Sequence, residues 1–219
     1  MGELNRSVAP FPVAYSNEVG QSEYIPFERR RYDITFSGYL SWRRLDFFRQ
    51  FTLFHSLPER NLKNPTLIRA YKVLLKLLYS KRDFSERWPN SYIKFTNGFA
   101  QGLSGGDYAN LIANSRVVLC PPGFASNECI RHWEAMRHGC IMVTAPLPGH
   151  YFYKGYPMYF VEQWSRLFDT INKAISDRAS MRRQHLEAME HWKNSSGEIS
   201  VARHMADVIL SNINSASRR

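Results

Sequence analysis

Short apolar runs alternate along the chain with longer segments in which apolar residues recur every three or four positions. The short runs predict buried strands at 33–38, 92–96, 116–120, 140–144 and 159–161. The longer segments predict helices at 43–56, 65–78, 107–113, 127–138, 164–177, 179–193 and 198–213. Pro65 suits the first turn of a helix, and Gly139 suits a left-handed helix end.

Strands that alternate with helices in this way predict an α/β fold, with a doubly wound parallel sheet and helices on both of its faces. Residues 1–31 show little periodicity and include three prolines, which favours an extended arm or linker. We expect one doubly wound domain over residues 32–180. C-terminal helices and a polar tail are expected to follow it at 181–219.

The composition is that of a folded globular protein. Of the 219 residues, 44% are hydrophobic and 22% are charged, which excludes wholesale disorder and collagen-like repeats. No apolar run approaches the roughly 18–20 residues that span a bilayer, and the first residues lack a secretory-signal pattern. We therefore expect no transmembrane segment and a cytoplasmic location. Three cysteines without a Cys-x-x-Cys pair predict buried free thiols in a reducing compartment.

The net charge of +10 changes the range of expected partners. The first 100 residues carry 16 of the 29 basic side chains but 9 of the 19 acidic ones, so most of the excess lies in that half. Such an excess favours polyanionic partners: nucleic acid, a membrane surface, or the phosphate groups of a small molecule. Charge alone does not choose among the three.

The segment 116–143 carries the strongest candidate site. It predicts a strand, a turn over 121–127 that contains Gly123, a helix capped by Ser126 or Asn127, and a second strand. Ligands of such sheets bind beyond the carboxyl ends of the strands. Gly123 allows close backbone approach, and a helix start offers unpaired N–H groups at the positive end of its dipole. We therefore expect a phosphate or diphosphate at this turn.

One face of that helix is polar and consists of Asn127, Arg131, Glu134 and His138. Arg131 could contact phosphate oxygens, and Glu134 could accept hydrogen bonds from ribose hydroxyls. An alternative of equal weight is a solvated face with an Arg131–Glu134 ion pair worth only about 0.2–0.5 kcal/mol.

A second loop, after the first strand, offers Gly38, Arg43 and Arg44. Arginines at a helix start oppose the helix dipole unless an anion is present, which favours contact with another side of the diphosphate. The alternative is solvent-facing arginines that lie over Trp42. A third, glycine-rich loop at 96–106 could present Phe99 to a nucleobase, although an ordinary connection is favoured there.

The sequence lacks the motifs of several other sites. The pairs His132/His138 and His185/His191 are six residues apart, which misses the helical zinc spacing, so we expect no metal and no tightly bound cofactor. Hydrolase elbow, P-loop and dinucleotide-binding glycine motifs are also absent from the sequence.

Two blocks resemble exostosin-like glycosyltransferases. The first is Asp33-Ile-Thr-Phe-Ser-Gly38 followed by Arg43. The second and more specific block runs from Tyr108 to Gly123 and continues through Ser126, Arg131, Glu134-Ala135, Gly139-Cys140 and Val143. Met142 departs from the proline that is common in this family.

The resemblance covers about residues 32–180 and implies one half of a GT-B fold, in which two Rossmann-like domains face each other across a cleft. That half is the C-terminal one, which holds a nucleotide-sugar donor. Carried over by position, Gly38 and Arg43 would face the diphosphate, and Gly123, Ser126 and Asn127 would form the phosphate loop. Arg131 would help to neutralise charge, and Glu134 would hold the ribose. Such enzymes generally need no tightly bound catalytic metal.

The expected function is transfer of a sugar from a nucleotide-sugar to an acceptor hydroxyl. In this family the acceptor domain, with the base of inverting members, normally precedes the block. Only 31 residues precede Tyr32, which leaves three alternatives: the chain is a fragment, the acceptor half comes from another polypeptide, or the domain no longer catalyses. We therefore nominate no general base. A non-catalytic nucleotide-sugar sensor is one alternative. A nucleic-acid-binding module that uses the 14 Phe, 12 Tyr and 5 Trp is a less favoured one.

Overall fold

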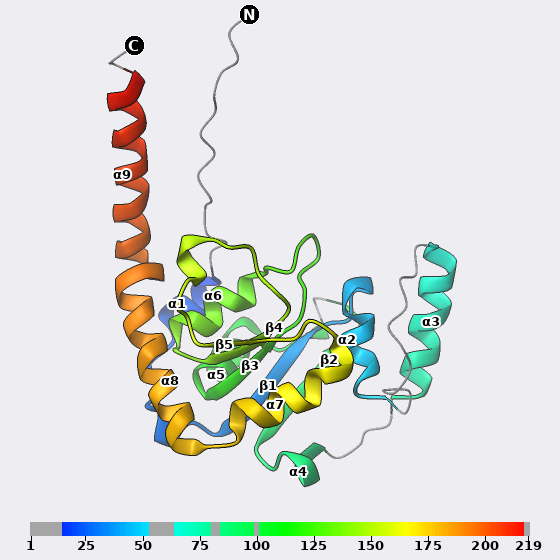
Figure 1. The fold of residues 1–219 in the computed structure, drawn as a ribbon. Coiled ribbons are helices and arrows are strands. Elements are labelled where there is room, and N and C mark those ends of the chain that lie inside the picture. Colours follow the sequence, from blue (N-terminus) through cyan, green and yellow to red (C-terminus); the bar gives the residue numbers. More distant parts are fainter. Residues whose placement is uncertain (1–14, 53–63, 80–83, 99–100, 217–219) are drawn as a thin grey trace, which may run out of the picture.

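A five-stranded parallel sheet forms the centre of the computed structural model, which describes residues 15–52, 64–79, 84–98 and 101–216 (Figure 1). The strand order is β2-β1-β3-β4-β5. The strands are β1 (Tyr32–Tyr39), β2 (Ser91–Thr96), β3 (Ser115–Cys120), β4 (Ile141–Thr144) and β5 (Met158–Phe160). The predicted α/β fold with a parallel sheet is confirmed.

Helices pack on both faces of this sheet (Figure 1). The α-helices are α1 (Asn17–Gln21), α2 (Leu45–Arg49), α3 (Pro65–Leu77), α4 (Phe84–Arg87), α5 (Gly105–Ala113), α6 (Ile130–Arg137), α7 (Leu167–Ile175), α8 (Arg178–His191) and α9 (Glu198–Ala216). The 3-10 turns are η1 (Phe27–Arg29), η2 (Trp42–Arg44), η4 (Tyr151–Tyr153) and η5 (Trp164–Arg166), and a π-helical turn over Trp192–Ser196 joins α8 to α9.

Side chains of the central strands alternate between two apolar cores. Val117 and Leu119 of β3 face the core that includes α2 and α7. Val118 and Cys120 face the opposite core, which includes α5, α6 and α8. Because both faces are covered, the strands are apolar throughout, which is why short continuous apolar runs predicted them correctly.

The predicted helices differ from the structure mainly at their ends. The helix expected at 43–56 is only η2 and α2, because the amides of Gln50, Phe51 and Thr52 bond to carbonyls three residues earlier and close the helix. Residues 53–56 lie outside the described part. Gly139 ends α6 with a φ of +62°, as predicted.

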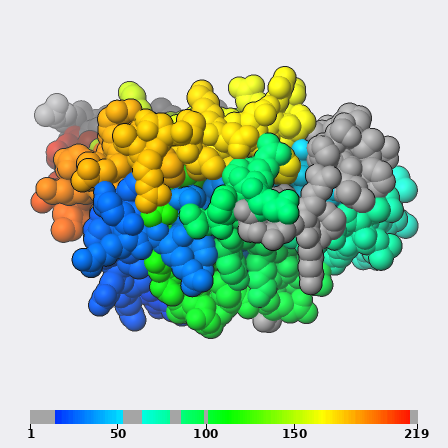
Figure 2. Space-filling model, turned by 90° about the horizontal axis from the view of Figure 1, so that it is seen from below, coloured from blue at the N-terminus to red at the C-terminus, as the bar shows by residue number. Residues whose placement is uncertain are grey.

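Residues 1–31 were expected to form an extended arm or linker. Residues 1–14 lie outside the described part, and over 15–31 the prediction is wrong. Residues 15–31 contain α1 and η1, and they bury Val19 and Phe27. The buried Arg30 donates to the carbonyl oxygen of Ser115 at 2.7 Å and to that of His138. Figure 2 shows part of this segment in blue on the underside of the molecule, beside the orange C-terminal helices. The segment is therefore an integral layer of the domain.

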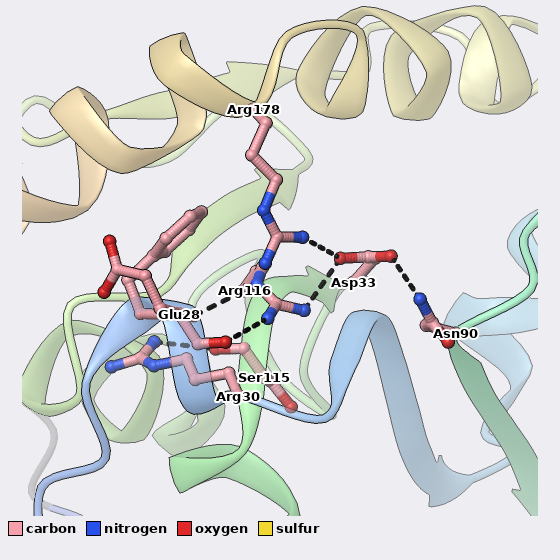
Figure 3. Close-up of polar contacts among 8 residues, drawn as sticks. Glu28, Arg30, Asp33, Asn90, Ser115, Arg116 and Arg178 are labelled. Carbon is pink, nitrogen blue, oxygen red and sulfur yellow. Dashed lines mark hydrogen bonds and ion pairs between the residues drawn. The ribbon is translucent and has the colours of Figure 1, made fainter.

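Asp33 joins this layer to the start of α8 (Figure 3). Its carboxylate accepts from Arg116 at 2.8 Å, from Arg178 at 3.3 Å and from the Asn90 amide at 3.0 Å. Arg182 of α8 adds an ion pair with Glu28 at 2.8 Å. Arg116, Arg178 and Arg182 therefore form ion pairs with acidic residues of the protein itself.

Candidate functional site

Three loops meet beyond the carboxyl ends of β1, β3 and β4, and Asn127 joins them. The guanidinium of Arg43 donates to the carbonyl oxygen of Ala125 at 3.3 Å and to Oδ1 of Asn127 at 3.2 Å. Nδ2 of Asn127 donates to the carbonyl oxygen of Pro146 at 2.8 Å. The side chain of Arg43, from the loop after β1, and the carbonyl group of Pro146, from the loop after β4, thus hold the predicted turn over 121–127.

Arg44 also contacts the turn over 121–127. Its Nε donates to the carbonyl oxygen of Pro122 at 2.8 Å, and its Nη1 donates to that of Tyr39 at 2.9 Å. Burial and the neighbouring charge of Arg131 lower the pKa of Arg44 to about 10, so it stays protonated at neutral pH. Arg43, by contrast, is half-buried and lies 5.6 Å from the ring of the exposed Trp42. The alternative, in which both arginines face solvent and lie over Trp42, is therefore wrong for Arg44, which is buried. For Arg43 it holds in part, because this side chain lies over Trp42 but is half-buried.

Other protein atoms lie close to both of the predicted site glycines, Gly38 and Gly123. A Cβ atom on Gly38 would lie 2.6 Å from Nη2 of Arg131, and one on Gly123 would lie 2.5 Å from the carbonyl oxygen of Glu128. The second clash is with backbone, which cannot swing away. Gly123 is thus needed for the turn itself, in addition to any approach of a ligand.

The helix that follows the turn begins later than predicted. α6 starts at Ile130 with Cys129 as its N-cap, so the prediction of Ser126 or Asn127 as the cap is wrong. The Ser126 hydroxyl donates to the Glu128 carbonyl at 2.9 Å, and Asn127 is held by Arg43 and Pro146. These contacts keep residues 124–128 as an exposed to half-buried turn ahead of the helix.

Arg131 and Glu134 do not form the solvated face that was one alternative. Their exposed fractions are 7% and 2%. Arg131 donates to the carbonyl oxygen of Ser37 at 2.7 Å, and its guanidinium lies 5.0 Å from the ring of Phe36. Within the described residues, Nε and Nη1 of Arg131 and Oε2 of Glu134 have no hydrogen-bond partner.

Glu134 lies under the N-terminal layer. Burial raises the pKa of its carboxyl group, while Arg131 and hydrogen bonds with Tyr108 and Ser16 lower it; the net shift is upward. Ser16 caps α1, so the carboxylate is covered from that side. Contact of Glu134 with a ribose therefore stays a prediction that would require this cover to move.

Cys129 and His132 form a pair that the sequence interpretation missed. Nδ1 of His132 lies 3.0 Å from the carbonyl oxygen of Cys129 and 3.5 Å from its Sγ. The Thr144 hydroxyl donates to the carbonyl of Ala145, so it accepts from Nε2 of His132, at 2.8 Å. The available signal was a Cys-x-x-His spacing at a helix start.

Burial would raise the pKa of the Cys129 thiol, but the His132 hydrogen bond and the positive charges of His132, Arg131 and Arg44 outweigh it, which lowers that pKa to about 6. All three cysteines are free, and Cys120 and Cys140 are buried, as expected. Cys129 is only half-buried, so the expectation of a buried thiol is wrong for it.

We expect iodoacetamide to alkylate Cys129 selectively, with a rate that rises between pH 5 and 7 around a midpoint near 6. Peptide mass spectrometry of timed reactions would measure this. His132→Gln should move the midpoint upward toward that of an ordinary thiol. Equal, slow labelling of all three cysteines in the folded protein would contradict the assignment.

The remaining surroundings offer open space but no metal centre. Across the described ranges, no group of three His, Cys, Asp or Glu side chains could hold a metal ion, and no helix is long and apolar enough to cross a membrane. A hollow of about 380 Å³ lies beyond β5 and is lined by Phe160, Val161, Glu162, Gln163, Arg166 and Thr170.

The third, glycine-rich loop follows β2. The hydroxyl of Thr96 donates to the carbonyl oxygen of Gly98 at 3.0 Å. Phe99, which the sequence offered for contact with a nucleobase, lies outside the described residues.

The comparisons with known proteins show a shared fold. Sucrose-phosphate synthase from Thermosynechococcus elongatus matches 92% of this chain with a TM-score of 0.53 at 12% identity, over 52% of its own length. Anabaena Alr3699/HepE, solved in complex with UDP, matches 83% of this chain with a TM-score of 0.50 at 14% identity, over 49% of its length. The C-terminal domain of a group 1 family glycosyl transferase (LpcC) from Francisella tularensis has a TM-score of 0.48 at 12% identity, over 80% of this chain and 96% of its own. No family model and no curated protein sequence matches the chain.

The class that the fold and topology define is therefore the Rossmann-like α/β domain, a fold that this chain shares with parts of sucrose-phosphate synthase and HepE. The chain spans about half the length of the first two solved structures. At these identities the likeness concerns the fold, and function must be argued from the site.

Proposed function

We propose that this chain is the donor-binding half of an exostosin-like glycosyltransferase, which transfers a sugar from a nucleotide-sugar to an acceptor hydroxyl. The observation that carries the proposal is the contact of Arg43 with both Ala125 and Asn127. Through this contact the half-buried guanidinium of Arg43 lies beside the exposed turn that leads to the start of α6. Arginine and a helix start are the two features that recognise a diphosphate.

Further support comes from location. The turn follows β3, and Arg43 follows β1. From β1 the chain continues to β2 on one side and β3 lies on the other side, so the site lies between the two strands at which the order of the strands in the sheet changes direction. Ligands of open α/β sheets bind at such a point. UDP is bound in the solved structure of HepE, which shares this fold.

In the proposed reaction, the bond between the anomeric carbon and the diphosphate oxygen breaks while the acceptor oxygen bonds to that carbon. Negative charge then builds on the departing diphosphate. Arg43 and the amides at the start of α6 would stabilise that charge, while Arg44 would hold the turn that positions them. The acceptor and its base are assigned to another domain or chain.

Arg43→Ala should weaken UDP binding about 10- to 100-fold, because a charge-assisted hydrogen bond contributes roughly 1.5–3 kcal/mol. Isothermal titration calorimetry would measure the change. Arg183→Ala is the matched control, since Arg183 is exposed on α8 and its guanidinium donates to the nearby Ser180 hydroxyl at 3.2 Å. GDP and ADP should be titrated in parallel to identify the base.

Two outcomes would count against the proposal: wild-type protein that binds none of these diphosphates, or equal affinity in the Arg43 and Arg183 variants. A nucleotide-sugar sensor is the second candidate, and it predicts the same binding without turnover. Release of UDP from a nucleotide-sugar with a supplied acceptor would separate the enzyme from the sensor.

The nucleic-acid alternative loses support from the contacts. Arg30, Arg44, Arg116 and Arg131 are buried and donate to oxygens of the protein itself. Many of the aromatic side chains contact one another in the core, such as Phe36 with Phe47 at 4.9 Å between ring centres. Neither group offers a free basic face with stacking platforms.

A further inference from the structure

α3 has two apolar faces, and one of them packs against other described parts of the protein. Its inner face packs on the end of β1, on α2 and on β2: Leu75 is fully buried, with Ile68 and Tyr71 beside it. The helix is capped by Asn64, whose side chain accepts from the Thr66 amide at 2.9 Å. α3 is thus a formed helix whose position is fixed by the core.

The outer face carries a second apolar stripe in the open. Leu67, Ala70, Leu74 and Leu77 recur at steps of three, four and three residues, so they lie along one side of the helix. The exposed fractions are 55% for Leu67, 47% for Leu74 and 79% for Leu77, and Val73 beside them is 57% exposed. Single exposed leucines are ordinary, but a continuous stripe indicates a binding surface.

Charge selects the kind of partner. The 13 residues of α3 include Arg69, Lys72 and Lys76 and no acidic residue. Arg69 and Lys76 are exposed and lie along the border of the stripe, whereas Lys72 turns inward and donates to the carbonyl oxygen of Leu40 at 2.6 Å. Leucines flanked by cations and free of carboxylates are the pattern of helices that lie in the surface of an anionic bilayer.

We propose that the outer face of α3, formed by Leu67, Ala70, Val73, Leu74 and Leu77 with Arg69 and Lys76, binds the surface of an anionic lipid membrane. The helix would lie on the membrane and not cross it. It stands at the periphery of the domain (Figure 1).

The location of α3 connects this surface with the candidate donor site. Leu40, which accepts from Lys72, follows β1 directly and precedes the loop that carries Arg43. α3 therefore packs beside the loop that we assign to the diphosphate, and a membrane on its outer face would lie across the helix from that loop. Lipid binding requires no nucleotide, so it can be tested independently of the proposed function.

Vesicle flotation with the full chain tests the proposal. Wild-type protein should float with phosphatidylcholine vesicles that contain a quarter phosphatidylglycerol and should bind pure phosphatidylcholine at least tenfold less. Leu74→Gln/Leu77→Gln should lower binding to the mixed vesicles at least tenfold. Leu186→Gln/Ile199→Gln, at similarly exposed positions on α8 and α9, should leave it unchanged. Circular dichroism would confirm that both variants are folded.

Variants that remove positive charges, and a test for dimer formation, examine the proposal further. Arg69→Gln/Lys76→Gln should weaken binding to the mixed vesicles more than Lys193→Gln/Arg203→Gln, although both variants lose two positive charges. The proposal is overturned if wild-type protein floats with neither vesicle, or if the α3 and control variants bind alike. It is also overturned if wild-type protein does not float but forms a dimer that Leu74→Gln/Leu77→Gln dissociates, which would make the stripe a protein interface.

Discussion

Gly123→Ala should reduce UDP affinity at least about a hundredfold, more than loss of Arg43, because it disturbs the Arg43 contact, worth roughly 1.5–3 kcal/mol, together with the turn that leads to the start of α6. The added Cβ would lie 2.5 Å from the carbonyl oxygen of Glu128, which is backbone and cannot rotate away. The turn must then shift, and with it the carbonyl of Ala125 and the side chain of Asn127 that hold Arg43. Calorimetry with UDP would measure the loss.

Gly149→Ala is the matched control for this experiment. Gly149 lies in the loop after β4, and a Cβ there would meet nothing within 4 Å. Both variants should keep the far-UV spectrum of the wild type, because Gly123 stands outside the strands and helices. If Gly123→Ala binds UDP as well as Gly149→Ala does, the turn is not the diphosphate site, and the donor must bind elsewhere.

The sequence was sufficient for the parallel sheet. Val117, Val118 and Leu119 are apolar without a break because helices cover both faces, so their run identifies a strand whatever the remote partners are. Gly139 could be assigned as a helix end because its φ of +62° is a local requirement. Features decided within a few residues were predicted well.

The details of the site depend on contacts that are distant in sequence. Asn127 fails to cap α6 because Arg43 and Pro146 hold its side chain, and neither is a neighbour in the chain. Arg131 and Glu134 are buried because Ser37 and the segment around Ser16 lie against them. Helical periodicity gives the common face of these residues but not what covers it.

The same periodicity explains why α3 was predicted without its second face being noticed. A pattern with apolar residues at 67, 68, 71, 74, 75 and 78 fits a helix of the ordinary amphipathic kind. The structure divides these positions between the core and solvent. Only the packing of Leu75 and Ile68 on Phe48 and Leu45 identifies the leucines that remain outside.

Arg131→Met should destabilise the domain by about 3–5 kcal/mol, because it leaves the buried carboxylate of Glu134 without its neighbouring positive charge. Urea denaturation at pH 7 would measure the free energy of unfolding. Glu134→Gln should cost less, since it removes the charge together with its need for a partner. In the double variant the two effects should fall short of additive by at least about 1 kcal/mol, because the side chains interact.

The pH dependence distinguishes this charge effect from lost packing. Burial already raises the pKa of Glu134, and removal of Arg131 should raise it further. A group whose pKa is raised by folding destabilises the folded state as pH rises through that pKa, and the penalty disappears once the carboxyl is protonated in both states. The loss of unfolding free energy in Arg131→Met should therefore be smaller at pH 4.5 than at pH 7, whereas the loss caused by a cavity under Phe36 would be the same at both.

One outcome would contradict the structural role of Arg131. If Arg131→Met is as stable as the wild type at pH 7 yet no longer binds UDP, Arg131 serves the ligand. Its Nε and Nη1, which have no partner among the described residues, then mark the place where the diphosphate binds.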